Sequence, residues 1–325
     1  MKEFSVTKND AGQRLDRWLA KTVPLLPAQL AHKYIRLKRV KLNGRGSAGD
    51  VRLAEGNLIQ LYINDEFFDT PSRENAFLSI FKPQLDILYE DEHLLLVDKK
   101  PGIVVHPDDR EKINTLITHI QAYLYQKKEW SPYAENAFAP ALCNRIDRNT
   151  GGIVIAAKTA SALRVMNQKI KDRELEKYYL CIIHGTISPL SGTLEHILLK
   201  DEATNQVSVH YKAVPGGRTA ITRYRTVKTA NGLSLMECEL VTGRTHQIRA
   251  QFAAAGHPLL GDGKYGRERD NARYDRKFQA LYSYKLVFSF TTDGEVLEYL
   301  NGRSWQVSDV PFVQEYFPER PGNNS

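Results

Sequence analysis

The residue of this 325-residue chain best suited to chemistry is an aspartate flanked by two arginines. Asp147 lies in the run Asn144-Arg145-Ile146-Asp147-Arg148-Asn149-Thr150-Gly151-Gly152, directly before an apolar segment. Because neighbouring cations favour the charged form of a carboxylate, Asp147 is expected to be ionised at neutral pH. Such a carboxylate can act as a nucleophile or as a base. The competing interpretation is a surface ion pair that leads into a glycine turn.

Two further runs place polar side chains beside strand-like segments. The first is Lys177-Tyr178-Tyr179-Leu180, although a tyrosine pair in a strand is commonly half core and half surface. The second extends from Thr242 to Arg249 and is followed by Gly256-His257-Pro258-Leu259-Leu260-Gly261-Asp262. Its mixture of polar side chains exceeds what solubility requires. No third ligand at zinc spacing accompanies His246 and His257, so no metal site is expected.

Cofactor, export and membrane classes find no support in the sequence. The three cysteines are far apart and form no Cys-x-x-Cys pair, which excludes a cysteine-based zinc site and fits a reducing cytoplasm. No phosphate-loop or dinucleotide-binding motif is present, so no cofactor is expected. No run approaches the roughly 18 apolar residues of a membrane span, and the polar start MKEFSVTKND does not resemble a signal peptide. We expect a cytoplasmic protein without membrane contact.

The basic residues are concentrated near the N-terminus. The chain has 45 Lys and Arg against 38 Asp and Glu, and six of the basic residues fall between Lys33 and Arg45. A focused positive charge suits a polyanionic partner, because phosphate contacts release counterions. The alternative is a solvated helix face. The expected RNA-binding residues of this segment are Lys33, Arg36, Lys38, Arg39 and Lys41.

Residues 1–63 are predicted to form a compact unit. Apolar residues recur at helical spacing from Leu15 to Val23, a second helix is expected after Pro27, and Val40-Lys41-Leu42 alternates like a strand before a final apolar run from Leu58 to Ile63. Over residues 12–63 this pattern resembles the alpha-L RNA-binding module of a ribosomal small-subunit protein. The resemblance implies docking on structured RNA through phosphate and shape contacts.

The rest of the chain is predicted to be a linker over 64–80, a catalytic domain over 81–310 and a tail over 311–325. Helices are expected near Thr115–Gln126 and Ala160–Lys171, among many short strands. These strands favour an α+β fold with a mixed, mostly antiparallel sheet. The expected strands begin with a hairpin of residues 87–89 and 94–97 and continue with 103–105, 153–155, 178–183, 219–226, 233–241 and 281–290.

From about Leu88 to Phe290 the chain resembles the RluA-type pseudouridine synthases. The resemblance rests on the joint presence and order of five motifs. It implies an extended sheet with the active cleft across its middle, where Asp147, Tyr179 and Arg249 should converge. The motifs are Lys99-Lys100-Pro101-Gly102 with His106-Pro107, the run around Asp147, Lys177-Tyr178-Tyr179, Gly243 to Arg249, and Gly256 to Asp262.

The resemblance also implies roles for individual residues. Asp147 matches the catalytic aspartate, which attacks the target uridine at the anomeric carbon or at carbon 6. Tyr179 matches the tyrosine that stacks on the target base and is implicated in removing the carbon-5 proton, and Arg249 matches the arginine paired with the aspartate. Arg145 matches the arginine that enters the RNA stack as the uridine flips out. Arg244 and Gln247 are expected to contact RNA.

The chain departs from the family pattern at two places, where Asn144 replaces a frequent His and Gly151 replaces a frequent Ser. Neither position carries the covalent chemistry.

The expected function is isomerisation of uridine in structured RNA, most of all large-subunit ribosomal RNA, by a monomer without an obligate protein partner. The alternatives are a transfer RNA substrate, a non-catalytic RNA-binding or ribosome-assembly protein, and a hydrolase that uses two carboxylates on a sugar bond.

Overall fold

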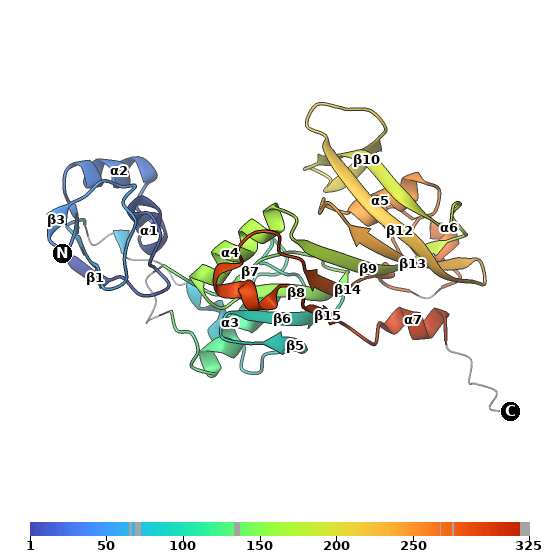
Figure 1. Ribbon diagram of the computed structural model, residues 1–325, viewed down its shortest axis with the longest axis horizontal. Coiled ribbons are helices and arrows are strands. Elements are labelled where there is room, and N and C mark those ends of the chain that lie inside the picture. Colours follow the sequence, from blue (N-terminus) through green and yellow to red (C-terminus); the bar gives the residue numbers. More distant parts are fainter. Residues whose placement is uncertain (65–66, 69–72, 133–136, 267, 275, 319–325) are drawn as a thin grey trace.

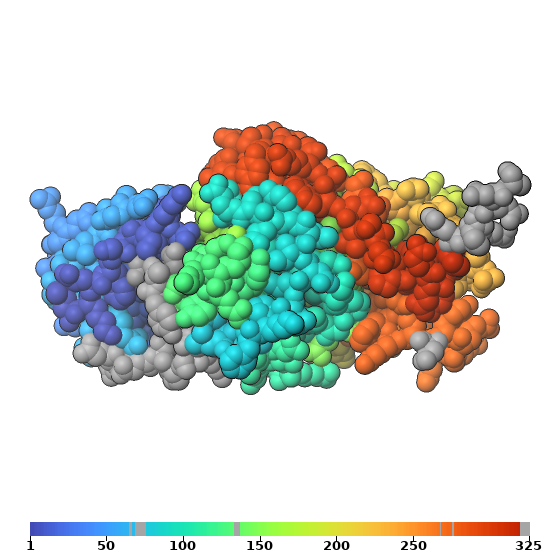
Figure 2. All heavy atoms as spheres, turned by 90° about the horizontal axis from the view of Figure 1, so that it is seen from below, coloured from blue at the N-terminus to red at the C-terminus, as the bar shows by residue number. Residues whose placement is uncertain are grey.

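The computed structural model describes residues 1–64, 67–68, 73–132, 137–266, 268–274 and 276–318. They form a small N-terminal module and a large domain built on one long sheet (Figure 1). Figure 2 shows the module in blue at one end of the molecule and the orange segment before β14 toward the other end. The expected α+β class with a mostly antiparallel sheet is confirmed.

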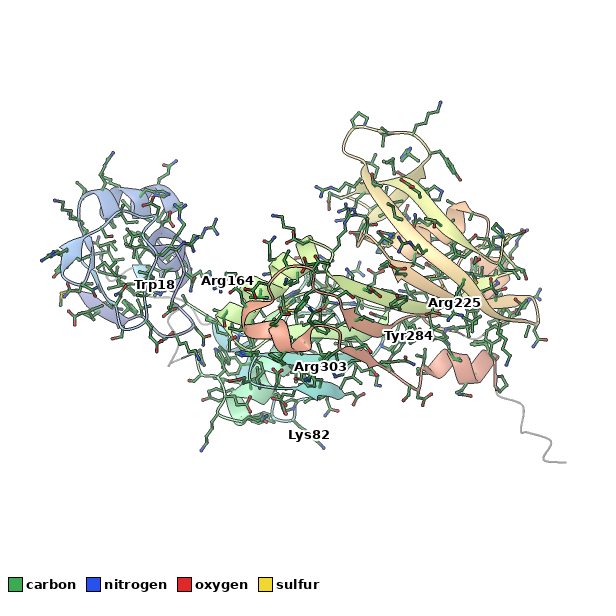
Figure 3. The ribbon with its side chains drawn as sticks, viewed as in Figure 1. Trp18, Lys82, Arg164, Arg225, Tyr284 and Arg303 are labelled. Atoms are coloured by element: carbon green, nitrogen blue, oxygen red, sulfur yellow. The ribbon has the colours of Figure 1, made fainter. Side chains whose placement is uncertain are left out.

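The N-terminal module packs two helices against a four-stranded antiparallel sheet of order β1-β4-β2-β3. The apolar stripe predicted for its first helix is buried, with Leu15, Trp18, Leu19 and Val23 fully inaccessible. Figure 3 shows Trp18 among the side chains of this unit. The elements are β1 (Lys2–Ser5), α1 (Leu15–Thr22), α2 (Ala28–Arg36), β2 (Val40–Leu42), β3 (Arg45–Gly46) and β4 (Leu58–Leu61).

The large domain is organised by an 11-stranded sheet whose main path runs β11-β10-β12-β13-β9-β14-β8-β6-β5. All its pairings are antiparallel except that of β8 with β14. The short strands β7 and β15 pair with β8 and β14. The strands are β5 (Ile87–Glu90), β6 (Leu94–Lys99), β7 (Ala141–Leu142), β8 (Gly151–Ala157), β9 (Leu175–His184), β10 (Ser191–Asp201), β11 (Gln206–His210), β12 (Arg218–Ala230), β13 (Leu233–Leu240), β14 (Leu281–Phe288) and β15 (Ser304–Gln306).

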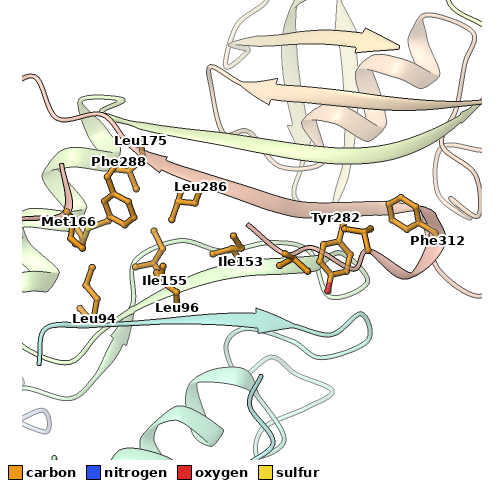
Figure 4. Packing of buried hydrophobic residues seen from close by; sticks show 14 of the residues in the cluster. Leu94, Leu96, Ile153, Ile155, Met166, Leu175, Tyr282, Leu286, Phe288 and Phe312 are labelled. Atoms are coloured by element: carbon orange, nitrogen blue, oxygen red, sulfur yellow. The ribbon is translucent and has the colours of Figure 1, made fainter. Parts of the chain in front are cut away.

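Both faces of the sheet centre are buried, so residues 94–97 of β6 and 153–157 of β8 are continuous apolar runs. Successive side chains of a strand point to opposite faces. Leu94 and Leu96 therefore join one core, shown in Figure 4 with Met166 and Phe288, whereas Leu95 joins the other. The covering helices are α3 (Leu116–Gln126), α4 (Ala160–Lys171), α5 (Gln247–Ala254), α6 (Glu268–Asn271), α7 (Pro311–Tyr316) and the 3₁₀-helices η2 (Arg73–Ser79) and η3 (Glu295–Leu300).

The structure differs from the sequence expectations at several elements. Residues 103–105, expected to be a strand, make only an isolated bridge from Val104 to Thr115, because the chain after Thr115 turns directly into the helix of residues 116–126. The 3₁₀-helix η2 lies inside the segment expected to be a linker, and its Phe77 is buried in the core. Phe312 of the expected tail is buried as well. Residues 65–66, 69–72 and 319–325 of these two segments lie outside the described residues.

Candidate active site

The loop that carries Asp147 is placed by a close contact between two strands. Asp147 lies between β7 and β8, and a Cβ atom on Gly151 would lie 2.3 Å from the ring of Tyr282 in β14. At Gly152, where φ is 115°, an added Cβ would lie 2.2 Å from the carbonyl oxygen of Ser283. Only glycine allows this approach. The departure at Gly151 is thus explained by packing, and it fixes the point at which the Asp147 loop leaves the sheet.

Asn144 and Lys99 hold the remainder of the loop. The Asn144 side chain accepts the backbone N–H of Ile155 at 2.8 Å, so it extends the pairing of β8. Lys99, which is 1% exposed, donates to the backbone carbonyl of Arg148 at 2.9 Å and to two carbonyls of its own loop. Burial lowers the pKa of Lys99 to about 7, whereas the charge of Asp147 and the three carbonyl acceptors favour its ammonium form.

Arg249 of α5 links Asp147 to a second, buried carboxylate. Its Nη1 donates to Oδ2 of Asp147 at 2.8 Å, while Nε and Nη2 donate to the two oxygens of Asp262 at 2.7 and 2.9 Å. Asp262 is fully buried. Burial opposes the charge of Arg249, but Asp262 and Asp147 together raise its pKa above the ordinary value. The guanidinium is therefore permanently charged and fixed in orientation.

Tyr179 reaches the same region from β9. Its side chain is buried and lines the same hollow as Asp147 and Arg249. Burial raises the pKa of Tyr179 to about 12, and the charge of Asp147 acts in the same direction. Tyr179 is consequently a neutral phenol at neutral pH. The three residues that were expected to converge, from positions up to 102 apart, thus line one hollow.

Two adjoining hollows meet at Asp147. One, of about 330 Å³, is also lined by Lys177, Tyr179 and Arg244; the second, of about 620 Å³, is also lined by His106 and Lys264. Asp147 lines both, and 27% of its side chain is exposed. The carboxylate is thus open to a small group that enters a hollow, and closed to a base that stays stacked in a helix.

The residues expected to contact RNA near the site divide into two kinds. Arg145 is exposed and lines both hollows, and half-buried Arg244 lines the smaller one. Gln247 is 2% exposed, and its amide bonds Thr242, the backbone N–H of Arg244 and two groups of β12. Because these contacts occupy its polar atoms, Gln247 supports the 242–244 turn. In this structure the Gln247 side chain is directed into the protein and not toward the RNA side of the hollow.

The basic residues of the N-terminal module lie apart from the two hollows. Lys33, Arg36, Lys38 and Arg39 are exposed, and Lys41 is half-buried. Arg36 and Lys38 line a separate hollow of about 450 Å³ on the module, together with the backbone turn of residues 46–49. These side chains form a cationic surface of the module, separate from the arginines Arg145 and Arg244 that line the hollows around Asp147.

Two residues of the site, Asp262 and Lys99, were not assigned a role from the sequence. Asp262 ends the family motif that begins at Gly256, but the pairing of Asp262 with Arg249 depends on the tertiary fold. Within the described part of the chain, no group of three or more His, Cys, Asp or Glu side chains is arranged to hold a metal ion. In the same residues, no helix has the length and apolarity needed to cross a membrane.

Comparisons with known proteins find relatives that cover most of the chain. Residues 93–254 match the family model for RNA pseudouridylate synthase. An uncharacterized RNA pseudouridine synthase of Mycoplasma genitalium is 32% identical, with 88% of each chain covered. Ribosomal large subunit pseudouridine synthase D of Zymomonas mobilis is 30% identical over 91% of this chain and 92% of the relative. The fold is also similar to human RNA Pseudouridylate Synthase Domain Containing 1, with a TM-score of 0.56, 20% identity and coverage of 72% of this chain and 86% of that one.

Proposed function

Because this chain belongs to the RluA-type family of RNA pseudouridine synthases, we propose that it isomerises uridines of large-subunit ribosomal RNA with Asp147 as the nucleophile. The reaction breaks the bond between the ribose and N1 of uracil, forms a bond from the same ribose carbon to carbon 5, and moves the carbon-5 proton to N1. Atoms and charge balance without water or a redox partner. The chemistry therefore needs only a nucleophile, a route for one proton and a way to hold the base.

The contact between Arg249 and Asp147 carries the proposal. A guanidinium at 2.8 Å holds the carboxylate in one place, and its second contact with buried Asp262 prevents the guanidinium from following the substrate. In this arrangement Asp147 presents a fixed negative charge to the hollow. Both oxygens of Asp262 are engaged by Arg249, so Asp262 is not free to act as the second catalytic carboxylate that a sugar hydrolase needs.

Base flipping follows from the burial of the site. The Asp147 side chain is only 27% exposed, and Tyr179 lies inside the hollow, so the target uridine has to leave its helix to reach them. In the proposal Tyr179 stacks on the flipped base, and its neutral hydroxyl relays the carbon-5 proton toward N1, taking up that proton as it releases its own. Exposed Arg145, at the junction of the two hollows, fills the position that the uridine leaves in the RNA.

Two observations favour large-subunit ribosomal RNA over transfer RNA. Relatives from Zymomonas mobilis and Vibrio vulnificus that cover most of this chain are named as ribosomal large subunit pseudouridine synthases D and C. The N-terminal module adds a separate cationic surface, including Arg36 and Lys38, which suits an extensive structured RNA.

Pseudouridine mapping in a strain that lacks this gene tests the proposal. The strain is complemented with wild type, with Asp147→Ala or with an empty vector, and total RNA is mapped. We expect particular sites in large-subunit ribosomal RNA to disappear and to return only with wild type. Sites that disappear from transfer RNA would assign the alternative substrate. An unchanged map, with a growth or assembly defect that Asp147→Ala still rescues, would instead support a non-catalytic RNA-binding protein.

A further inference from the structure

His246 adopts an uncommon backbone conformation directly beside the proposed nucleophile. It is the N-cap of α5, with φ 52° and ψ 21°, in the left-handed region that few non-glycine residues occupy. Its side chain is 8% exposed and makes no capping hydrogen bond to the helix. Residues in such unfavourable conformations are concentrated at functional sites, so the contacts of the His246 side chain are informative.

The hydrogen bonds around His246 determine which nitrogen of its imidazole carries the proton. Nδ1 lies 2.8 Å from the Tyr265 hydroxyl, which already accepts the backbone N–H of Val207 at 2.9 Å. If Nδ1 carried the proton, the hydroxyl would accept twice, and its own hydrogen would have no acceptor among the described residues. The satisfied arrangement has Tyr265 donating to Nδ1, so the ring proton is on Nε2. Burial lowers the pKa of His246, partly opposed by Asp147, which favours this neutral ring.

The Nε2–H group lies beside one particular oxygen of Asp147. Nε2 is 3.7 Å from Oδ2, the oxygen that also accepts Arg249 Nη1 at 2.8 Å. Although 3.7 Å exceeds a hydrogen bond, contacts of catalytic groups are often long before the substrate binds. Oδ1 accepts no hydrogen bond from the described part of the chain. Two donors thus converge on Oδ2 and leave Oδ1 free.

From this geometry we infer that His246 is a positioning residue, whose Nε2–H closes onto Oδ2 of Asp147 when RNA binds and leaves Oδ1 as the attacking oxygen. The inference rests on the proposed function, in which Asp147 is the nucleophile. Oδ1 donates an electron pair to a uridine carbon, and the pair displaced from that carbon moves into the uracil ring. When the product leaves, the bonding pair returns to Oδ1. His246 gives and takes no proton, and holds the carboxylate in one orientation through both steps.

The variants His246→Gln and His246→Asn separate this role from a purely structural one. A Gln amide N–H reaches about as far as Nε2, whereas an Asn amide reaches only as far as Nδ1. Asn, however, tolerates the left-handed backbone better. We therefore expect the Gln variant to keep most of kcat, and the Asn variant to lose about 10- to 100-fold in kcat at unchanged KM for RNA. A structural role predicts the opposite order, with Asn the better variant in both activity and stability.

The assay follows tritium release from RNA that was labelled at carbon 5 of uridine in a strain lacking this gene. Tyr265→Phe is the third variant, since it leaves the backbone of His246 in place and removes the hydroxyl that fixes the tautomer. We expect its kcat to fall several-fold and the nitrogen-15 NMR signature of the Nε2–H tautomer to be lost. An Asn variant as active as the Gln variant, or a Tyr265→Phe enzyme with wild-type kcat and tautomer, overturns the inference. Tritium release by Asp147→Ala would overturn the proposed function instead.

Discussion

At the scale of single residues, the orientation of Arg249 depends on a carboxylate that solvent does not reach. Asp262 is fully buried, and besides the two contacts with Arg249 its Oδ1 accepts the backbone N–H groups of Lys264 and Tyr265. Hydrogen bonds from Arg249 help to lower the pKa of Asp262 although burial alone would raise it. Asp262 therefore anchors the cation that in turn holds Asp147.

Replacing Asp262 by Asn should impair both folding and catalysis. An amide retains the shape but leaves the buried Arg249 with one carboxylate in place of two. Breaking a buried pair costs about 3 kcal/mol of unfolding free energy. We also expect kcat to fall by at least tenfold, because the guanidinium is free to turn away from Asp147. Urea unfolding at pH 7 and single-turnover tritium release measure the two effects.

The matched control is Glu239→Gln, whose partner Arg223 is exposed and lies at 3.0 Å. An exposed pair contributes about 0–1 kcal/mol. If Asp262→Asn were no more destabilising than this control, the buried pair would not anchor the site.

The site could be predicted from sequence only as far as motifs mark it. Asp147 and Arg249 stand in strings typical of the family, and the structure brings them to 2.8 Å. The contribution of Lys99 could not be predicted, because its three acceptors are backbone carbonyls, which any residue provides. The orientation of His246 could not be predicted either, because its left-handed φ and its tautomer depend on neighbours that are distant in the sequence.

At the scale of elements, α4 is joined to β9 by a buried ion pair. Lys169 of α4 and Glu174, which precedes β9, are 2% and 4% exposed, and Nζ lies 2.7 Å from Oε2. The hydroxyls of Thr291 and Thr292 donate to the other carboxylate oxygen at 2.6 and 2.9 Å. The hydrogen bond from Lys169, followed by those from the threonines, lowers the pKa of Glu174 to about 2.

This pair predicts a loss of stability in acid. An unfolded Glu174 has a pKa near 4.5, so between about pH 4.5 and 2 the unfolded chain binds more protons than the folded one. The stabilisation from Glu174 is therefore complete above pH 4.5 and declines as the pH falls through this window. At pH 7 Glu174→Gln should lose about 3 kcal/mol, because Lys169 stays buried without a counter-charge. Urea unfolding should show a smaller difference from wild type at pH 3.5 than at pH 7; an equal difference at both would contradict the assignment.

The arginines of strand β12 differ in whether a nearby carboxylate neutralises them. Arg223 and Arg225 pair with Glu239 and Glu237, and Figure 3 shows Arg225 near Tyr284, whose hydroxyl also donates to Glu237. Arg218 has no carboxylate within salt-bridge distance in the described residues. Burial, followed by the charges of Arg218 and Arg173, lowers the pKa of Arg244 at the hollow. Unpaired cations that crowd one another suit a bound phosphate.

Arg218→Gln should consequently weaken RNA binding more than Arg225→Gln does. Both changes remove one positive charge from the same strand, but Arg225 is already neutralised by Glu237. We expect Arg218→Gln to reduce the slope of log affinity against log salt by about one. Filter binding over a series of salt concentrations measures the slope. Equal effects of the two changes would show that net charge alone matters.

Elements with a clear period were predictable, and others were not. The helix expected at Ala160–Lys171 has these bounds in the structure, because its apolar residues recur on one face. Helix α5 was missed because Gln247 to Phe252 are all buried, which removes the amphipathic pattern and leaves a string of polar letters. The hairpin of β10 and β11 was also missed, since Ile197, Leu198 and Leu199 of β10 are consecutive and do not alternate with polar residues as in a half-exposed strand.

At the scale of the whole molecule, exposed cations lie on both units of the protein. One surface is on the N-terminal module, and the other is on the large domain, where Arg145 and Arg244 line the hollow and Arg218 lies nearby. The N-terminal module, with Arg36 and Lys38, lies at the end opposite β10 and β12 in Figure 1. It contacts the large domain where Asn9 accepts the backbone N–H of Ala160 at 3.1 Å, beside Arg164. A single RNA that engages both surfaces has to be large enough to span them. The arrangement therefore favours an extensive structured substrate over a short single strand.

A double variant of the module tests whether it contributes affinity or chemistry. Lys33→Gln with Arg36→Gln removes two exposed cations without touching the hollows around Asp147. Each lost phosphate contact should lower the salt slope by about 0.7 to 0.9, so we expect a decrease of one to two units and a higher KM at unchanged kcat. Lys82→Gln, an exposed cation of the large domain labelled in Figure 3, is the control and should leave the slope unchanged. A lower kcat at saturating RNA would mean that the module acts on the catalytic step, whereas an unchanged slope would place the RNA on the large domain alone.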